Sequence, residues 1–552
     1  MRRLWMVIAL LVVVAVLASC APAATPAPEA TEAPPAPTAA PEATTAPEPA
    51  PTTAPPAPAV PQILNINMRL APTMLDPQQE TAAVGKMVNS NVFDALVSLD
   101  ASMEPVPELA KDWEISDDGL TYTFYLEEGV TFHDGTPFNA EAVKFSFERL
   151  LDPDTGSAFF GDYEMIESIE VIDDSTVEFT LEYAHGPFLR RMAMVEASIV
   201  SPTAVEEWGE DFAANPVGAG PFKVTEYVSG ERVVLTRNED YWRELPKLEK
   251  VNFTFIAEEQ ARVSALLAGD TDFDTIIPPS LIPMVEADPN MVIERGPTLF
   301  PEWVGFNVEK APFDDPLVRK AVGYCVDMDT IIEGVFLGVG VRSTQPVAPG
   351  VYGFDDTIEP IPYDPDMAAD LLAQAGWEDT DGDGVVDKDG QKFSVEFKVM
   401  PLTEIQRMAE SIQGYMADVG MEANIVVEDW GAYLADLGAG NMNMFVLGQE
   451  NPMGDAGATM GILFHSDQID FNNTTRYNNP EMDRLIDAER READPEARLE
   501  LLKEAVNLAV DDAVHVPTFV REHVMAHHSK VKGFVLHPSD TFLKLDTVYI
   551  EE

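Results

Sequence analysis

The spacing of hydrophobic positions predicts both strands and helices in this chain. Tyr122, Phe124 and Leu126 lie two residues apart and share one face, which is the two-residue period of a β-strand. The next apolar positions have a helical period and follow Asn139, a residue type that caps helices. They are Val143, Phe147, Leu150 and Leu151.

Three later segments predict amphipathic helices. The first begins at Asp364-Pro365 and ends at Gly376, with this apolar face: Met367, Leu371, Leu372 and Ala375. The second opens at Asp494-Pro495, with this stripe: Leu499, Leu502, Val506 and Ala509. The third lies near Gly414 and Gly420, around these positions: Ile405, Met408, Ile412 and Tyr415. Strands and helices that alternate in this way predict an α/β protein of several domains.

The N-terminal residues follow a different pattern. Met1-Arg2-Arg3 precedes an apolar run from Leu4 to Ala18, which is short for a membrane span and typical of a signal peptide, so we assign residues 1–19 to a signal. The run ends in Leu17-Ala18-Ser19-Cys20, which resembles the lipobox of bacterial lipoproteins. That resemblance implies that Cys20 receives a diacylglycerol and becomes the new N-terminus. The alternative is a simple secretory signal with a chance cysteine.

The segment that follows has the composition of a linker. Residues 21–61 consist mainly of Ala, Pro, Thr and Glu and contain no residue large enough to seed a core. Proline favours an extended chain, so residues 20–61 are predicted to be a lipidated cysteine and its tether.

Composition excludes several classes of function. With 35 Lys+Arg against 95 Asp+Glu, the net charge is −60, which excludes ordinary binding to nucleic acid and favours ligands that carry cationic groups. Two cysteines exclude a disulfide framework and CxxC chemistry. Cys325 lies in an apolar helical context and is expected to be an inert buried thiol.

Motifs for catalysis are missing from the sequence. It has no GxSxG, no GxxxxGK[ST], no HExxH and no GxGxxG after a strand, so we expect neither an enzyme nor a cofactor. His523, His527 and His528 are close in sequence, but a strand would scatter their side chains. A solvated surface is therefore expected for them rather than a metal site.

One acidic stretch partly matches a calcium loop. Asp379, Asp381, Asp383 and Asp387 occupy ligand positions around Gly384 and its neighbours, but Gly390 stands where a bidentate Glu would complete the shell. A tight acidic turn is the favoured interpretation, so no metal site is predicted.

A family resemblance is carried by the segment PELAKDWEISDDGLTYTFYLEEGVTFHDGTPFNAEAVKFSFERLLDP, from Pro107 to Pro153. It resembles the diagnostic block of the bacterial extracellular solute-binding proteins of family 5, the oligopeptide, dipeptide and nickel class that serves ABC importers. Further stretches agree in the same order, and the resemblance covers essentially residues 62–550. They are Leu75-Asp76-Pro77, Pro216 to Phe222, Arg237 to Trp242, Gly305-Phe306-Asn307, Pro312 to Asp315, and Val531 to Phe534.

The resemblance implies a class II periplasmic-binding-protein-like α/β fold, with two lobes, a hinge and an inserted extra domain. Ligand would lie between the lobes, and hinge closure would bury it. Such a protein performs no chemistry. It works outside the cytoplasm, in the periplasmic space or on the outer face of the membrane, with a permease and an ATPase as partners, and is expected to be a monomer. The implied ranges are 62–105, 225–308 and 521–552 for lobe one, 106–224 for the inserted domain, and 309–520 for lobe two.

The resemblance also implies a ligand site. Peptide-binding relatives use an aromatic-Gly-x-Asp stretch, whose carboxylate binds the ligand's α-amino group. The matching stretch here is Leu447-Gly448-Gln449-Glu450-Asn451-Pro452, so Glu450 would supply the carboxylate, with Asp455 as a competing acceptor; the alternative is a merely polar loop. Further candidates are Gln449, Asn451, Asn307, Phe159 and Met74. Trp303 and Trp430 could stack on a ligand, but single aromatic residues more often belong to the core.

Together these features predict a lipid-anchored substrate-binding protein for di- and oligopeptides. An oligosaccharide or a nickel or haem complex is the alternative ligand. A secreted hydrolase and a sensory receptor without a transporter are the rival classes.

Overall fold

The computed structural model describes residues 60–551, which belong to one compact unit, Ala59–Glu552. The predicted signal peptide, Cys20 and nearly all of the predicted tether lie outside the described residues. Within the described part of the chain, no helix combines the length and the apolarity that crossing a membrane requires. Strands and helices alternate throughout, so the α/β class is confirmed.

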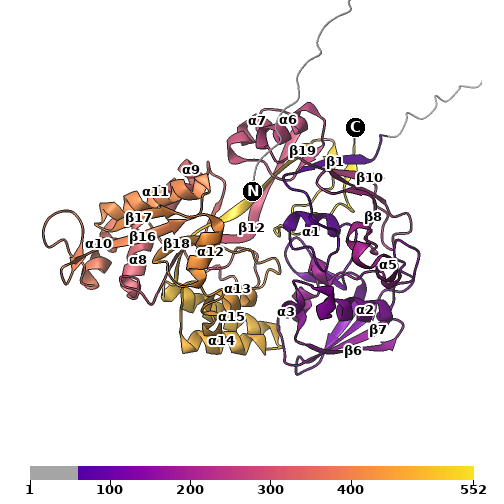
Figure 1. Cartoon of the computed structure of the whole chain (residues 1–552), viewed down its shortest axis with the longest axis horizontal. Helices are drawn as coiled ribbons and strands as arrows, with labels where there is room; N and C mark the ends of the chain where they lie inside the picture. Colours follow the sequence, from indigo (N-terminus) through magenta and orange to yellow (C-terminus); the bar gives the residue numbers. More distant parts are fainter. Residues whose placement is uncertain (1–59, 552) are drawn as a thin grey trace, which may run out of the picture. The chain divides into compact units, whose positions relative to one another are not determined.

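The main sheet has eleven strands. Its order is β17-β16-β18-β12-β19-β11-β1-β10-β9-β8, and β13 pairs with β19 (Figure 1). The strands are β1 (Ile63–Met68), β8 (Phe222–Val228), β9 (Arg232–Arg237), β10 (Lys250–Phe255), β11 (Phe273–Asp274), β12 (Met291–Phe306), β13 (Val341–Arg342), β16 (Ser394–Val399), β17 (Glu422–Val427), β18 (Met444–Gly448) and β19 (His515–His528).

Two long strands join the two halves of this sheet. The start of β12, Met291–Pro297, pairs with residues 522–528 of β19 beside β11, and the end of β12 pairs with the start of β19 beside β18. The register between the two strands shifts between Pro297 and Trp303. Proline cannot donate to a ladder, so Pro297 and Pro301 mark the place where regular pairing is interrupted between the halves.

A smaller antiparallel sheet has the order β4-β5-β7-β6, and α2 (Ala140–Leu150) packs on it (Figure 1). The predicted strand is β5, with the expected alternation of burial, and Asn139 caps α2 by accepting a hydrogen bond from the Ala142 N–H at 3.1 Å. We call this sheet, α2, and the helices α3 and α4 the small-sheet region. Its elements are β4 (Ala110–Ile115), β5 (Thr121–Leu126), β6 (Ile166–Asp173), β7 (Thr176–Leu181), α3 (Phe160–Tyr163) and α4 (Phe188–Arg191).

Three helices after β18 pack on one another and form what we call the helical bundle (Figure 1). They are α13 (Ala456–Phe464), α14 (Pro480–Arg490) and α15 (Pro495–Asp511). One apolar cluster is continuous from the small-sheet region to the helical bundle, because Phe124 and Phe147 belong to the same buried core as Met453 and Leu502.

The remaining elements cover the main sheet or connect its strands. The helices are α1 (Ala83–Asn89), α5 (Pro202–Trp208), α6 (Glu259–Ala268), α7 (Ile282–Glu286), α8 (Pro316–Cys325), α9 (Met328–Val335), α10 (Pro365–Gln374), α11 (Thr403–Asp418) and α12 (Trp430–Gly438). Three short strand pairs are β2 (Val97–Leu99) with β3 (Pro105–Pro107), β14 (Asp387–Lys388) with β15 (Gln391–Lys392), and β20 (Val531–Lys532) with β21 (Tyr549–Ile550).

The two ends of the described chain meet. The Gln62 side-chain amide donates to the Ile550 carbonyl at 2.8 Å, and the Ile550 N–H donates to the Gln62 amide oxygen at 3.0 Å. These two bonds fix the start and the end of the described chain in the same half of the main sheet.

The three predicted helices are present, but two buried faces differ from the prediction. In α10, Asp364 caps as expected, yet the buried positions are Ala368 and Leu372, while Met367 is 41% exposed. In α15, Arg498 is buried and Leu499 only half-buried. The other predicted positions Leu372, Ala375, Leu502, Val506 and Ala509 are buried as expected. Arg498 was missed because apolar periodicity alone does not reveal a buried arginine that has partners.

The prediction that the C-terminal histidines lie on a solvated surface is wrong for two of them. His523 and His527 are buried, because β19 is covered on both faces and does not have one face in solvent. His527 stacks on Phe273 with ring centroids 5.6 Å apart, and His523 lies 3.1 Å from Asp540. Cys325 is buried as expected, and burial raises the pKa of its thiol to about 12.

Candidate ligand-binding site

A cavity of about 240 Å³ lies between the small-sheet region and the helical bundle. Each wall mixes apolar and charged side chains, and the two walls come from segments far apart in the sequence. The first wall includes Asp162, His185, Arg191 and Glu196; the second includes Pro452, Met453, Glu489 and Arg490. A pocket of mixed character between two parts of a chain is the usual form of a small-molecule site.

Main-chain contacts place the two walls against each other. The Gly186 N–H donates to the Arg490 carbonyl at the end of α14, at 2.9 Å. On the first wall, the Tyr163 hydroxyl donates to the Arg191 carbonyl at 2.9 Å, and the Arg191 guanidinium pairs with Asp162 at 2.8 Å. The end of α14 and the start of α4 are therefore held at the rim of the same cavity.

Several polar atoms at the cavity have no partner among the described residues. They are both ring nitrogens of His185, Nε of Arg191 and Oε1 of Glu489. Burial, together with the guanidinium groups of Arg191, Arg498 and Arg490, lowers the pKa of His185 to about 3, so its imidazole is neutral at pH 7. Burial raises the pKa of Glu489 to about 7. Buried polar atoms normally have partners, so these groups are suited to a ligand that supplies them.

A buried ion network lies behind the second wall. Arg498 of α15 pairs with Asp455 through two hydrogen bonds of 2.8 and 2.7 Å and with Glu489 at 2.8 Å. Arg190 approaches Asp455 at 3.8 Å from the small-sheet region. Burial opposes ionisation of Asp455, but pairing with Arg498 prevails and lowers its pKa. The Asp455 carboxylate also caps α13 through the Gly457 N–H at 2.9 Å, so its acceptors are used within the protein.

The loop after β18 holds three further sequence candidates. The Glu450 carboxylate accepts a hydrogen bond from the Asp540 N–H at 3.2 Å, and burial and the Asp540 charge raise its pKa to about 7. The Asn451 amide donates to the Asp455 carbonyl at 2.6 Å and to the Thr459 hydroxyl at 2.9 Å. Gln449 is half-buried, and its N–H donates to the Pro301 carbonyl at 3.3 Å. Asn451 therefore shapes the loop, while the Glu450 carboxyl has a single backbone donor among the described residues.

Lys86 connects Phe159 with this loop. Its ammonium lies 4.4 Å from the centroid of the Phe159 ring and 2.9 Å from Glu196, which lines the cavity. The same ammonium is close enough to Glu450 to lower its pKa, against the larger effect of burial. Lys86 thus contacts Phe159 and influences Glu450 through its charge.

None of the seven sequence candidates is among the residues that line the cavity; they are Glu450, Gln449, Asn451, Asp455, Asn307, Phe159 and Met74. The Met74 N–H donates to Glu80 at 3.0 Å, and the buried Asn307 amide donates to the Gly440 carbonyl at 2.9 Å. Trp303 is buried and stacks on His515 with centroids 4.7 Å apart, whereas Trp430 is 51% exposed and stacks on Tyr433.

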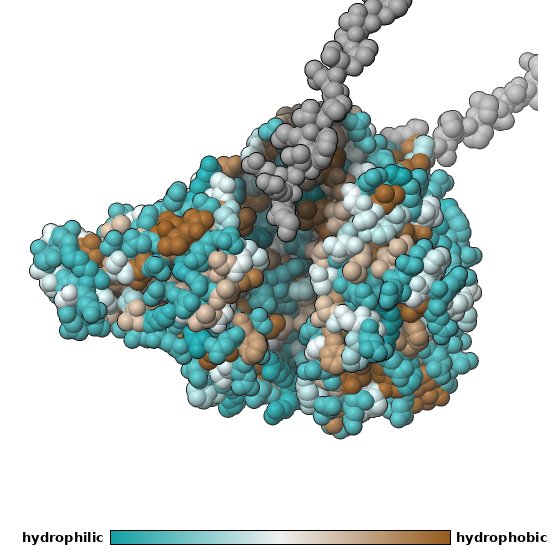
Figure 2. Space-filling model, in the orientation of Figure 1, coloured by the Kyte–Doolittle hydropathy of each residue, from teal (hydrophilic) through white to brown (hydrophobic). Residues whose placement is uncertain are grey.

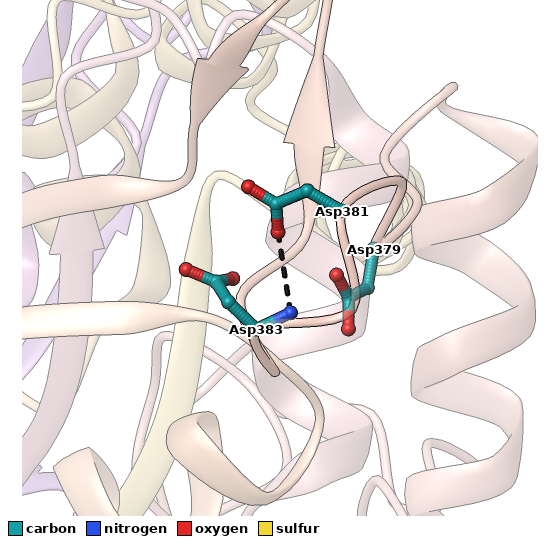
Figure 3. Close-up of side chains that lie close together, drawn as sticks. All are labelled: Asp379, Asp381 and Asp383. Carbon is teal, nitrogen blue, oxygen red and sulfur yellow. Dashed lines mark hydrogen bonds between the residues drawn. The ribbon is translucent and has the colours of Figure 1, made fainter.

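The acidic stretch forms a tight exposed turn (Figure 3). The carboxylates of Asp379, Asp381 and Asp383 are near one another, but the Lys392 ammonium pairs with Asp383 and, at 3.2 Å, with Asp381. The Asp387 carboxylate turns away and accepts hydrogen bonds from Thr380. The four carboxylates therefore do not converge on one point.

The sequence analysis missed His185, Arg191, Glu489 and Arg490. A usable signal was present in α13, where Gly457 and Gly461 are one helical turn apart. A Cβ at Gly461 would lie 2.3 Å from Nη2 of Arg490, and a Cβ at Gly457 would lie 2.6 Å from Oε1 of Glu489. Two glycines on one helix face indicate a close neighbour, and here that neighbour is the charged end of α14.

An α/β protein whose halves are joined by two long strands, with a charged cavity between two of its parts, has the construction of a solute receptor. The family model of the bacterial extracellular solute-binding proteins, family 5 Middle, matches residues 104–471. The chain belongs to this family. It is therefore a substrate-binding protein of the kind that serves ABC importers outside the cytoplasm, and it is not an enzyme.

Individual relatives match over most of the chain. The glutathione-binding protein GsiB of Salmonella typhimurium is 30% identical over 479 residues, covering 85% of this chain and 91% of the relative. The heme-binding protein A of Haemophilus influenzae is 30% identical over 478 residues, covering 82% and 85%. Among solved structures, the periplasmic binding protein DppA of Helicobacter pylori in complex with the peptide STSA has a TM-score of 0.71 and 29% identity, covering 89% of this chain and 98% of that one. The class II fold is thereby confirmed.

Proposed function

We propose that this chain is a lipid-anchored receptor that captures peptides between its two lobes and delivers them to an ABC permease. The observation that carries the proposal is the cavity between the small-sheet region and the helical bundle, where buried polar atoms of His185, Arg191 and Glu489 have no partner among the described residues. A peptide carries an ammonium and a carboxylate, and both need buried partners when water is removed. The relatives GsiB and DppA, one named for glutathione and the other solved with a tetrapeptide, support this class of ligand.

In this proposal Glu450 binds the ligand's ammonium group. Asp455, the competing acceptor, already has Arg498 and the first turn of α13 as partners, whereas Glu450 has, among residues 60–551, one backbone donor and the charges of Lys86 and Arg521. Phe159 would pack against the ligand beside Lys86, and Gln449, Asn451, Met74 and Asn307 would support the cleft walls. The lobe ranges given above remain part of this proposal, with β12 and β19 as the hinge and the monomer as the working form.

Isothermal titration calorimetry with a library of di- to octapeptides tests the ligand class. We expect at least one group of peptides to bind, and N-acetylation or Glu450→Gln to weaken it roughly 10- to 100-fold, because each removes one side of a buried charge pair. The two changes together should cost little more than either alone. If no peptide in the library binds, the assignment of peptides as the ligand class is refuted.

A haem or nickel complex is the second candidate, because heme-binding protein A is a comparably similar relative. Mass spectrometry of the ligand that copurifies with gently prepared protein distinguishes the two candidates. A peptide mass supports the first, and a metal complex supports the second.

A further inference from the structure

Arginine residues gather at the cavity of a very acidic protein. The whole chain has a net charge of −60, yet Arg191 and Arg490 line this cavity, and Arg190 and Arg498 lie behind it. Within residues 60–551, the Arg490 guanidinium makes no hydrogen bond or ion pair. Arg191 uses one nitrogen for Asp162 and leaves Nε buried without a partner. These two guanidinium groups come from opposite walls and keep donors for a ligand.

The acidic side chains at the same cavity are already engaged. Glu196 pairs with Lys86 at 2.9 Å, Asp162 with Arg191 at 2.8 Å, and Glu489 with Arg498 at 2.8 Å. Because the pKa of Glu489 is raised to about 7, its protonated form is well populated at neutral pH, and its free oxygen can then donate a hydrogen bond. The charge left over for a ligand is therefore positive.

His185 adds a neutral donor to the same cavity, close enough to both guanidinium groups for them to lower its pKa. Both of its ring nitrogens are buried and have no partner in the described chain. A neutral imidazole presents one N–H donor and one acceptor, and leaving a buried donor unsatisfied is unfavourable. A ligand atom that accepts hydrogen bonds would satisfy it.

The glycines of α13 hold this arrangement in place. Nη2 of Arg490 and Oε1 of Glu489 lie where the Cβ atoms of larger residues at Gly461 and Gly457 would be. The side chains at the end of α14 therefore lie directly against the α13 backbone, and both glycines line or adjoin the cavity. Close helix packing, and not a flexible loop, positions Arg490.

We propose that this cavity is a subsite for a carboxylate of the bound peptide, held by Arg490, Arg191 and His185. The proposal rests on the peptide function proposed above and makes it more specific. A planar guanidinium can donate two parallel hydrogen bonds to a carboxylate, which a neutral amide end cannot match. A volume of about 240 Å³ holds one end of a peptide and not a whole oligopeptide. The carboxylate comes from the ligand's C-terminus or from an acidic side chain.

Calorimetry with matched ligands tests the subsite on the unmodified protein. The first probe is a tetrapeptide that binds in the library screen, used as the free acid and as the C-terminal amide. The second pair of probes is the amide with either Glu or Gln as its last residue, which differ in one side-chain carboxylate. We expect amidation to weaken binding roughly 10- to 100-fold. If Glu in the amide restores affinity, the subsite accepts a side-chain carboxylate; if it does not, the subsite accepts the C-terminus. If free acid and amides all bind equally, the subsite is refuted while the peptide function stands. If no peptide binds in any form, the peptide function falls, and the subsite with it.

Variants then assign the effect to Arg490. In Arg490→Gln the preference for the free acid should disappear, and Arg490→Lys should keep only part of it, because lysine is a point charge. Gly461→Ala should also reduce the preference, since the new Cβ displaces the guanidinium while alanine favours the helix. Arg484→Gln is the matched control, because Arg484 pairs with Glu481 on the exposed face of the same helix. A full acid preference in folded Arg490→Gln would overturn the assignment.

Discussion

Glu450 has a carboxyl whose charged form is only partly compensated by neighbouring groups. Glu450 is half-buried, and partial desolvation together with the charge of Asp540 raises its pKa from 4.5 to about 7, an effect that the ammonium of Lys86 and the guanidinium of Arg521 offset only in part. A carboxyl whose pKa is raised by folding contributes most to stability when protonated. Its contribution is present below about pH 4.5 and is lost as the pH rises through 7.

Glu450→Gln should therefore stabilise the ligand-free protein at pH 8, by an order of magnitude of about 1–3 kcal/mol, and change little at pH 4.5. The amide oxygen can still accept the Asp540 N–H, so the change mainly removes the cost of ionisation. Urea denaturation of both proteins at the two pH values measures it. An equal difference at both pH values would contradict the raised pKa.

At the scale of elements, the helical bundle depends on one buried arginine. Arg498 of α15 pairs with Asp455 at the start of α13 and with Glu489 of α14, so a single guanidinium connects all three helices. Removing one partner of a buried network leaves the others as unpaired buried charges, which is far more costly than losing an exposed pair.

Arg498→Gln should lower the free energy of unfolding by about 3–5 kcal/mol. Arg484→Gln, which breaks an exposed pair on α14, should cost less than about 1 kcal/mol. Denaturant titrations of the two variants compare them directly. Similar losses for both would show that the buried network is not a main source of stability in the bundle.

Periodicity and capping residues predicted the elements well, because they depend on neighbours in the sequence. Asn139 and Asp364 cap helices as their positions indicate, and Tyr122, Phe124 and Leu126 form a strand. The cavity could not be predicted in this way. Its arginines lie in segments that meet only after the chain has returned through β18 and the helical bundle, and buried Arg498 looks like a polar position on the wrong face of α15.

At the scale of the molecule, a strongly acidic chain keeps guanidinium donors of Arg191 and Arg490 available at its cavity. Figure 2 shows a visible surface that is mostly hydrophilic, with small separate hydrophobic patches. Net charge of this size favours solubility and attracts cationic groups, whereas the local arginines attract an anionic one. A zwitterionic ligand is suited to both.

The predicted lipid anchor at Cys20 determines in which cell fraction the whole protein is found. We expect the wild-type chain in the membrane fraction, and Cys20→Ser in the soluble extracytoplasmic fraction, because two or more acyl chains are needed for stable membrane attachment. Fractionation followed by immunoblotting measures this. Wild-type protein in the soluble fraction would favour the simple secretory signal.

The pairing of Gln62 with Ile550 has a consequence for the order of the chain. Since residues near both described ends are hydrogen-bonded to each other, a short linker from Glu551 to Val60 could close the folded unit into a ring. The ring could be reopened at the exposed turn around Gly382 without cutting a strand of the main sheet. The position of the cut then decides which half of the main sheet comes first in the sequence. A circular permutant whose N-terminus lies in this turn should still bind ligand.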